Sequence, residues 1–326
     1  MSQVIGFQCP HCNAPLDINP EDAIFNCEAC GQALLSDGSI FDNHYILSNS
    51  ISQGNIQDII KNFIKKKGKL RGIKKYQITS ISPILLPFWG VAISASTHYM
   101  GYRQYTETRT RRGSKGRTIT TTEHITVYRH VENDIKEKRL VVLIGRRGSS
   151  MYGYENAKEI IRRDFNKAVP FNHNQLVKTE KDFQYLSSEI AAEAANQLAK
   201  TVVFDDHRAR AEKACTKVFD CATQITFEGV YFVHVPVWQV DYHFQGETYR
   251  VAISGNTGEI IIGEIPVTKL FRMIFLTLTF LLLIGGGTFS YFMNYSPVAT
   301  SIAGVIVALL GLLTLGNVFK SMKVVG

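Results

Sequence analysis

The pattern of apolar and polar positions predicts a helix followed by strands in the first half of the chain. Isoleucines and Phe63 recur every three or four positions between 56 and 67, which is typical of an amphipathic helix, and Asn55 precedes it as a helix cap. Residues 76–106, 118–130 and 139–144 are rich in Thr, Ile, Val and Tyr and are predicted as strands. Pro83 and Pro87 predict that the first of these strands is broken or lies at a sheet edge.

Helical sequence and then a β-meander are predicted in the second half. The candidate helices are 155–165, 182–199 and 206–219, and the candidate strands are 224–233, 235–244, 248–254 and 259–263. Gln245-Gly246 and the segment 255–258 (Gly-Asn-Thr-Gly) are hairpin signals between these strands. Both halves therefore predict an α+β body with antiparallel sheets.

A faint internal similarity links the two halves. The segment 87–91 reads Pro-Phe-Trp-Gly-Val and the segment 236–240 reads Pro-Val-Trp-Gln-Val, and they hold the only two tryptophans of the chain. Three interpretations stay open: a duplicated sheet module, two strands that pair through a tryptophan cluster, or chance.

The last 54 residues have a different pattern. Residues 273–292 and 297–319 contain no charged side chain, and only four residues separate them. About 20 apolar residues are enough for a helix to cross the hydrocarbon core, so the two runs predict a transmembrane helical hairpin. The alternative is a buried hairpin in a soluble core. No acid or histidine lies in the runs, which argues against ion-coupled transport by this chain.

Charge assigns a direction to this hairpin. The 326 residues carry a formal net charge of +8, and Lys269, Arg272, Lys320 and Lys323 flank the two runs while the link between them is uncharged. By the positive-inside rule both ends of the hairpin, and with them the N-terminal body, are expected in the cytoplasm. The composition of 45% hydrophobic and 20% charged residues excludes a disordered chain or a disulfide-rich toxin.

Four of the six cysteines form two C-x2-C pairs, Cys9 and Cys12 followed by Cys27 and Cys30. Two such pairs, each followed by turn residues and a short strand-like stretch, predict a zinc ribbon in which four thiolates surround a structural Zn²⁺. Disulfides and a redox pair are the alternatives. A cytoplasmic location disfavours disulfides, and a redox motif needs only one pair. Cys215 and Cys221 have no partner at ligand spacing and are expected to be plain buried thiols.

Residues 8–40 contain acids but no Lys or Arg, so this ribbon is a poor match for phosphate and a protein contact is favoured. Basic residues are concentrated elsewhere, in two segments that suit anionic lipid or, less well, nucleic acid. The candidate contact residues are Lys65, Lys66, Lys67, Lys69, Arg71, Arg109, Arg111, Arg112, Lys115 and Arg117. The alternative is that these basic residues only form an ordinary solvent-exposed surface.

No catalytic motif is found in the sequence. There is no phosphate-binding loop, no G-x-S-x-G elbow and no H-E-x-x-H motif. Asp205-Asp206-His207 could bind a metal, but it falls where a helix is predicted to begin and where Asp is a favoured cap. We therefore expect no enzymatic activity.

The order of these parts resembles a known family. The CPHC and CEAC knuckles, the Pro-Val-Trp strand at 236–238, the Gly-Asn-Thr-Gly turn and the C-terminal hairpin together are similar to bacterial and archaeal membrane proteins with a TFIIB-type zinc ribbon, often labelled replication factor Y-like or helicase-like. The helicase label does not fit, because no nucleotide-binding motif is present. Some members of the family are associated with phage-shock protein A-like and flotillin-like (SPFH) proteins, which they help to recruit to the membrane.

These observations combine into one expectation. The chain is predicted to consist of a zinc ribbon (1–40), a helix with an antiparallel β module (41–150), a helical segment with a β-meander (151–266) and a transmembrane hairpin (267–326). It is expected to act as a membrane-anchored adaptor or scaffold that recruits protein partners, with anionic lipids as a further partner and homo-oligomers as an option. The resemblance adds membrane stress or maintenance as the setting. The alternative function is a membrane-tethered nucleic-acid-binding protein.

Overall fold

The computed structural model describes most of the body and parts of the tail. The described residues are 7–16, 21–27, 29–35, 38–68, 73, 75–111, 121–147, 151–171, 183–267, 269–292, 310 and 322–325. Among these, the side chains of 7, 109–111, 121–123, 270, 283, 286–292 and 322–325 are not described.

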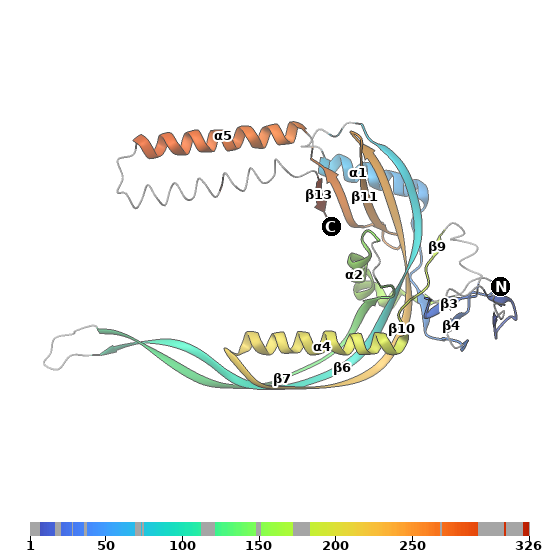
Figure 1. Cartoon of the computed structure of the whole chain (residues 1–326), viewed down its shortest axis with the longest axis horizontal. Helices are drawn as coiled ribbons and strands as arrows, with labels where there is room; N and C mark the ends of the chain where they lie inside the picture. Colours follow the sequence, from blue (N-terminus) through green and yellow to red (C-terminus); the bar gives the residue numbers. More distant parts are fainter. Residues whose placement is uncertain are drawn as a thin grey trace, which may run out of the picture.

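One large sheet forms the body (Figure 1). Its three long strands are β6 (Gln77–Arg111), β7 (Thr121–Ile144) and β10 (Lys217–Phe244). β6 pairs antiparallel with β7 on one side and with β10 on the other. The other strands are β11 (Glu247–Ser254), β12 (Ile260–Pro266), β13 (Met322–Val325), β5 (His44–Ile46), β8 (Val169–Pro170) and β9 (Gln184–Tyr185). Strands from both predicted middle segments thus lie in the same sheet.

β6 is continuous rather than broken, and its two prolines lie within residues 77–87, at an edge that β7 does not cover, which agrees with the edge alternative of the prediction. Pro83 lies opposite Trp238 and Pro87 opposite His234, both in regular register with β10. The carbonyl of Pro87 accepts a hydrogen bond from the amide of Gly145, just beyond the end of β7. A strand residue directs its N and its C=O to the same side, so the missing N–H of Pro87 faces the edge where β7 has ended.

β7 is also continuous, although two separate strands were predicted across 118–144. In its charged middle segment, 131–138, the even-numbered side chains are exposed, whereas Ile135 on the other face packs near Tyr99. Beyond the contacts of β5 and β11, the sheet narrows to β7, residues 88–111 of β6 and residues 217–231 of β10. We call this three-stranded part the blade.

Four α-helices are described with bounds, α1 (Gln53–Gly68), α2 (Tyr154–Asp164), α4 (Ala192–Ala214) and α5 (Lys269–Phe292), and a 3-10 turn (Phe165–Lys167) follows α2. α1 and α2 agree with the predicted helices. Ser52 rather than Asn55 occupies the position just before α1, since the amide of Ile56 donates to the Ser52 carbonyl. The two helices predicted across 182–219 are instead one helix, α4, which runs along the concave face of the blade (Figure 1).

The tryptophans lie in separate parts of the core. Trp89 of β6 packs beneath α4 with Ala195, Ala199 and Val203. Trp238 of β10 packs in a different cluster, which contains the apolar face of α1. The two strands therefore pair, but not through a tryptophan cluster. The order of helix, long strand and antiparallel neighbour occurs twice, as α1–β6–β7 and as α4–β10–β11, with β6 and β10 adjacent in the middle.

The tail begins with α5, which projects away from the body (Figure 1). Among the described residues, no helix combines the length and the apolarity that a membrane crossing requires. Apart from Leu310, the second charge-free run, 297–319, lies outside the described residues. After it, β13 pairs antiparallel with β12, with Met322 opposite Pro266 and Val325 opposite Gly263. Sequence reasoning did not anticipate this strand.

Candidate metal centre

Two similar turns carry the four N-terminal cysteines. Around the first, β1 (Phe7–Gln8) pairs with β2 (Pro15–Leu16), and around the second, β3 (Ile24–Asn26) pairs with β4 (Ala33–Leu35). In each turn the fourth residue after the leading cysteine donates its amide to that cysteine's carbonyl, at 2.8 Å for Asn13 and 2.6 Å for Gly31. Both residues have positive φ, 57° and 73°, which Asn and Gly tolerate better than other residues.

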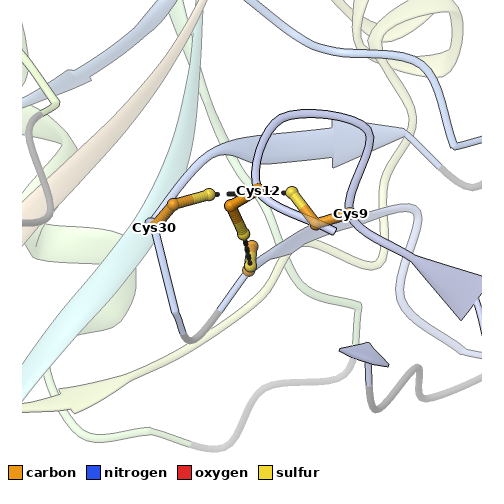
Figure 2. Close-up of side chains that lie close together, drawn as sticks. Cys9, Cys12 and Cys30 are labelled. Atoms are coloured by element: carbon orange, nitrogen blue, oxygen red, sulfur yellow. Dashed lines mark hydrogen bonds between the residues drawn. The ribbon is translucent and has the colours of Figure 1, made fainter. Parts of the chain in front are cut away.

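The turns bring the four thiols together. The Sγ atoms of Cys9 and Cys30 are 3.6 Å apart, as are those of Cys12 and Cys27, and all four lie within 4.8 Å of one another. None is in a disulfide. Figure 2 shows the labelled Cys9, Cys12 and Cys30 directing their sulfur atoms toward one another. A tetrahedron with metal–sulfur bonds of about 2.3 Å has sulfur–sulfur edges of roughly 3.8 Å, so the cluster fits a metal ion such as zinc.

The backbone around the first turn favours a thiolate. Burial alone would raise the pKa of Cys9, but hydrogen bonds from the backbone N–H groups of Cys12 and His11 lower it to about 7. In the second turn, burial raises the pKa of Cys27 and raises that of Cys30 to about 12. Metal ligation requires deprotonated thiols, so a metal ion bound here would displace protons from these cysteines.

The ribbon is docked on the sheet rather than extended from it. Ile24 of β3 forms a bridge with Ser188, in which each residue's amide donates to the other's carbonyl, at 3.0 and 3.1 Å. The Ile24 side chain is fully buried in the cluster that contains Trp89. The Trp89 indole N–H donates to the Ser188 hydroxyl and to the carbonyl of Ile190.

An ion-pair cluster reinforces this contact. The Arg146 guanidinium lies 2.5 Å from a carboxylate oxygen of Glu189 and 3.7 Å from one of Asp22 in the ribbon. Burial raises the pKa of Asp22, and Arg146 opposes that effect. No spacing rule in the sequence relates residues 22–24 to residues 146 and 188, so the docking could not be predicted.

A second acidic cluster joins α4 to the blade. His207, which is fully buried, lies 3.1 Å from Glu137 through Nε2 and 2.5 Å from the Thr97 hydroxyl through Nδ1. Arg139 and Arg210 each contact both Glu137 and Asp206. Burial would raise the pKa of Glu137, but the His207 hydrogen bond and the two arginines hold it below its ordinary value.

The two guanidinium groups already neutralise these carboxylates, so the cluster is better described as a salt-bridge network than as a cation site. The sequence had placed Asp205-Asp206-His207 at a helix start. That was wrong, because these residues lie inside α4.

A third polar group lies within the large sheet. In β5, His44 Nε2 is 2.8 Å from His234 Nδ1, and His234 Nε2 is 3.0 Å from the carbonyl of Leu186. A carbonyl only accepts, so His234 donates from Nε2 and its Nδ1 accepts from His44. Burial holds the pKa of His44 well below its usual value, and burial lowers that of His234 to about 3.

The candidate basic contacts do not form one patch in the described residues. Lys65, Lys66 and Lys67 are exposed at the end of α1, whereas Arg109 and Arg111 lie at the far tip of β6, at the opposite end of the molecule (Figure 1). Lys69, Arg71, Arg112, Lys115 and Arg117 lie outside the described residues.

Comparison with known protein families, with curated proteins and with solved structures found no match to this chain.

Proposed function

We propose that the protein is a membrane-anchored adaptor whose N-terminal body lies on the cytoplasmic side and whose four ribbon cysteines hold a structural Zn²⁺. The observation that carries the membrane part is the exposed apolar surface of α5. Seven of its large apolar side chains are 43–63% exposed: Met273, Ile274, Leu276, Leu278, Phe280, Leu281 and Ile284. Such a continuous apolar surface is unfavourable in water and suits lipid.

The position of the two ends supports a hairpin. The segment 267–321 leaves the sheet after β12 and returns at β13, which is the next strand in space. An excursion that starts and ends at one sheet edge crosses a bilayer an even number of times. The two charge-free runs of the sequence provide two crossings, and the lysines and Arg272 at their outer ends favour the cytoplasm.

The ribbon would then serve a structural and binding purpose. Four cysteine ligands complete a tetrahedral site and leave no open coordination position, so Zn²⁺ would stabilise a segment with little core of its own. Because the ribbon packs on the blade through Ile24 and Arg146, ribbon and blade form one platform for protein partners. The resemblance makes flotillin-like and phage-shock protein A-like proteins the first candidates. This proposal assigns no reaction to the chain.

Membrane topology tests the anchor. In intact cells, a membrane-impermeant thiol reagent should label Asn294→Cys, in the link between the runs, but not Thr257→Cys in an exposed turn of the body. Both should be labelled after permeabilisation. Full-length protein in the supernatant after ultracentrifugation without detergent would refute the anchor. Labelling of Thr257→Cys in intact cells would refute the cytoplasmic placement of the body.

Affinity capture tests the adaptor role. The wild type and Cys9→Ser, which removes a metal ligand, would be purified from detergent extracts with Cys221→Ser as the control for losing a thiol outside the cluster. We expect the wild type and the control to retain the same stoichiometric partner and Cys9→Ser to lose both zinc and that partner. Retention of every partner by the zinc-free variant would show that the ribbon does not support recruitment.

A further inference from the structure

The outer edge of β7 is long and regular. All 24 residues of the strand pair with β6 without a register shift, and β6 is its only neighbour among the described strands. Its second edge therefore presents backbone N–H and C=O groups that no described strand uses, a surface to which another strand can add.

The opposite edge of the blade is different. Along residues 217–231, β10 is interrupted by register shifts at Val218/Asp220 and at Phe227/Gly229. Such bulges twist an edge and prevent strand addition. Of the two blade edges, only that of β7 lacks this protection.

Charged side chains are the usual alternative protection of an edge, but those of β7 have a particular order. Around Ile135 the sequence places two acids, Glu132 and Asp134, before it and two bases, Lys136 and Lys138, after it. When two copies pair antiparallel about a two-fold axis at Ile135, residue 135 − n lies opposite residue 135 + n. Asp134 then faces Lys136 of the other copy, and Glu132 faces Lys138.

We propose that a second copy of this chain pairs with β7 along this edge and joins two blades into one continuous six-stranded sheet. Opposite charges directly across an antiparallel pair stabilise it, whereas like charges destabilise it. A shift of the axis by one residue to either side would place Asp134 or Lys136 opposite itself. The charges therefore select a single register.

The surroundings leave this pairing unobstructed. Glu132 and Asp134 contact His98 and are 52% and 53% exposed, on the face of the blade opposite α4. Lys138 reaches Glu228 but remains 73% exposed, and Lys136 is in no ion pair among the described residues. An axis perpendicular to the sheet keeps both α4 helices on the other face.

Charge reversal tests the proposal on the full-length protein, in detergent and in nanodiscs, with the molar mass measured by light scattering. The acidic variant Lys136→Glu/Lys138→Glu and the basic variant Glu132→Lys/Asp134→Lys each place like charges opposite one another. We expect the wild type to be dimeric, each variant alone to dissociate at a concentration at least tenfold higher, and an equimolar mixture of the two to recover a dimer of one acidic and one basic chain.

The control Lys61→Glu/Lys65→Glu makes the same change in net charge as the acidic variant, but on α1, away from β7, and should remain dimeric. A wild type that stays monomeric in both environments would overturn the proposal. Variants that dimerise as tightly as the wild type, or a mixture that stays monomeric, would do so as well. Variants that dimerise as tightly as the wild type would assign the contact to another surface such as α5.

Cross-linking checks the register independently. Ile135→Cys places a thiol on the two-fold axis, where paired strands bring equivalent Cα atoms to about 4.5–5.5 Å, within the range of a disulfide. Mild oxidation should link Ile135→Cys into dimers and leave Ile125→Cys unlinked, since residue 125 would lie ten residues from the axis. Equal linking of both variants would refute the register. The outcome does not depend on the membrane anchor.

Discussion

Ile24→Ala is predicted to undock the ribbon without unfolding the sheet. Ile24 is fully buried between the ribbon and Trp89, and its backbone pairs with Ser188. The substitution removes three carbon atoms. At about 0.8 kcal/mol for each buried CH₂, the loss is about 2.5 kcal/mol, and a residual cavity would raise it toward 5 kcal/mol. Since 1.4 kcal/mol corresponds to a factor of ten, the undocked population should rise by about 60-fold or more.

Amide hydrogen exchange measures this population directly. The amides of Ala23, Ile24 and Ser188 donate hydrogen bonds across the docking contact, at 2.7–3.1 Å. Their protection should fall by the same factor of about 60 in the variant, because one local opening exposes all three. Amides in the centre of β10, such as that of Val240, which lies between β6 and β11, should keep their protection.

The control is Ile40→Ala, the same deletion at a side chain that is 40% exposed. It should change the protection of Ser188 by only a few-fold. Unchanged protection at Ser188 in Ile24→Ala would refute the docking geometry. An equal loss of protection throughout β10 would refute the idea that ribbon and sheet open separately.

Two further predictions concern the body. Burial lowers the pKa of His234 to about 3 and holds that of His44 well below normal. Below pH 6.5 the unfolded chain therefore binds more protons than the folded one. The contribution of these histidines to stability should be complete above pH 6.5, and on acidification the free energy of unfolding should fall by up to about 1.4 kcal/mol per pH unit and per histidine. Urea unfolding of the detergent-solubilised protein at pH 7 and 5.5 should show this slope in the wild type but a much shallower one in His44→Leu/His234→Leu, and equal slopes would contradict it. A Cβ on Gly101 would lie 2.2 Å from the carbonyl oxygen of Lys217, so Gly101→Ala should lower the free energy of unfolding by about 1–3 kcal/mol. The control is Gly54→Ala in α1, where the nearest atom to the added Cβ is 3.9 Å away, and it should be neutral or stabilising. A neutral Gly101→Ala would argue against the β6–β10 register.

The elements that the sequence predicted well are those encoded over a few neighbouring residues. The turn at Gln245-Gly246 has positive φ at both residues, 53° and 88°, as its composition implied, and it joins β10 to β11 in register. The cysteine cluster belongs to the same group, because each C-x2-C turn is built from local backbone hydrogen bonds and needs nothing from the rest of the chain.

Elements that depend on distant neighbours were predicted less well. Asp206 has the composition of a helix cap, but in the structure it pairs with Arg139 of β7 and with Arg210 one turn further along α4. Those ion pairs, together with the burial of His207, hold α4 together across the predicted gap. Tertiary contacts of this kind override local preference, and a single sequence contains no signal for them.

The C-terminal strand shows why the tail was only partly predictable, and what its closure implies. β13 has four residues, too few for an alternating pattern to identify a strand, and only its register with β12 defines it. That register fixes the start and the end of the segment 267–321 at one sheet edge. β12 in turn packs through Ile265 into the cluster that contains the apolar face of α1 and Trp238. The segment is therefore held at both ends by a strand that belongs to the core, so its placement is set by the folded body as well as by its own hydrophobicity.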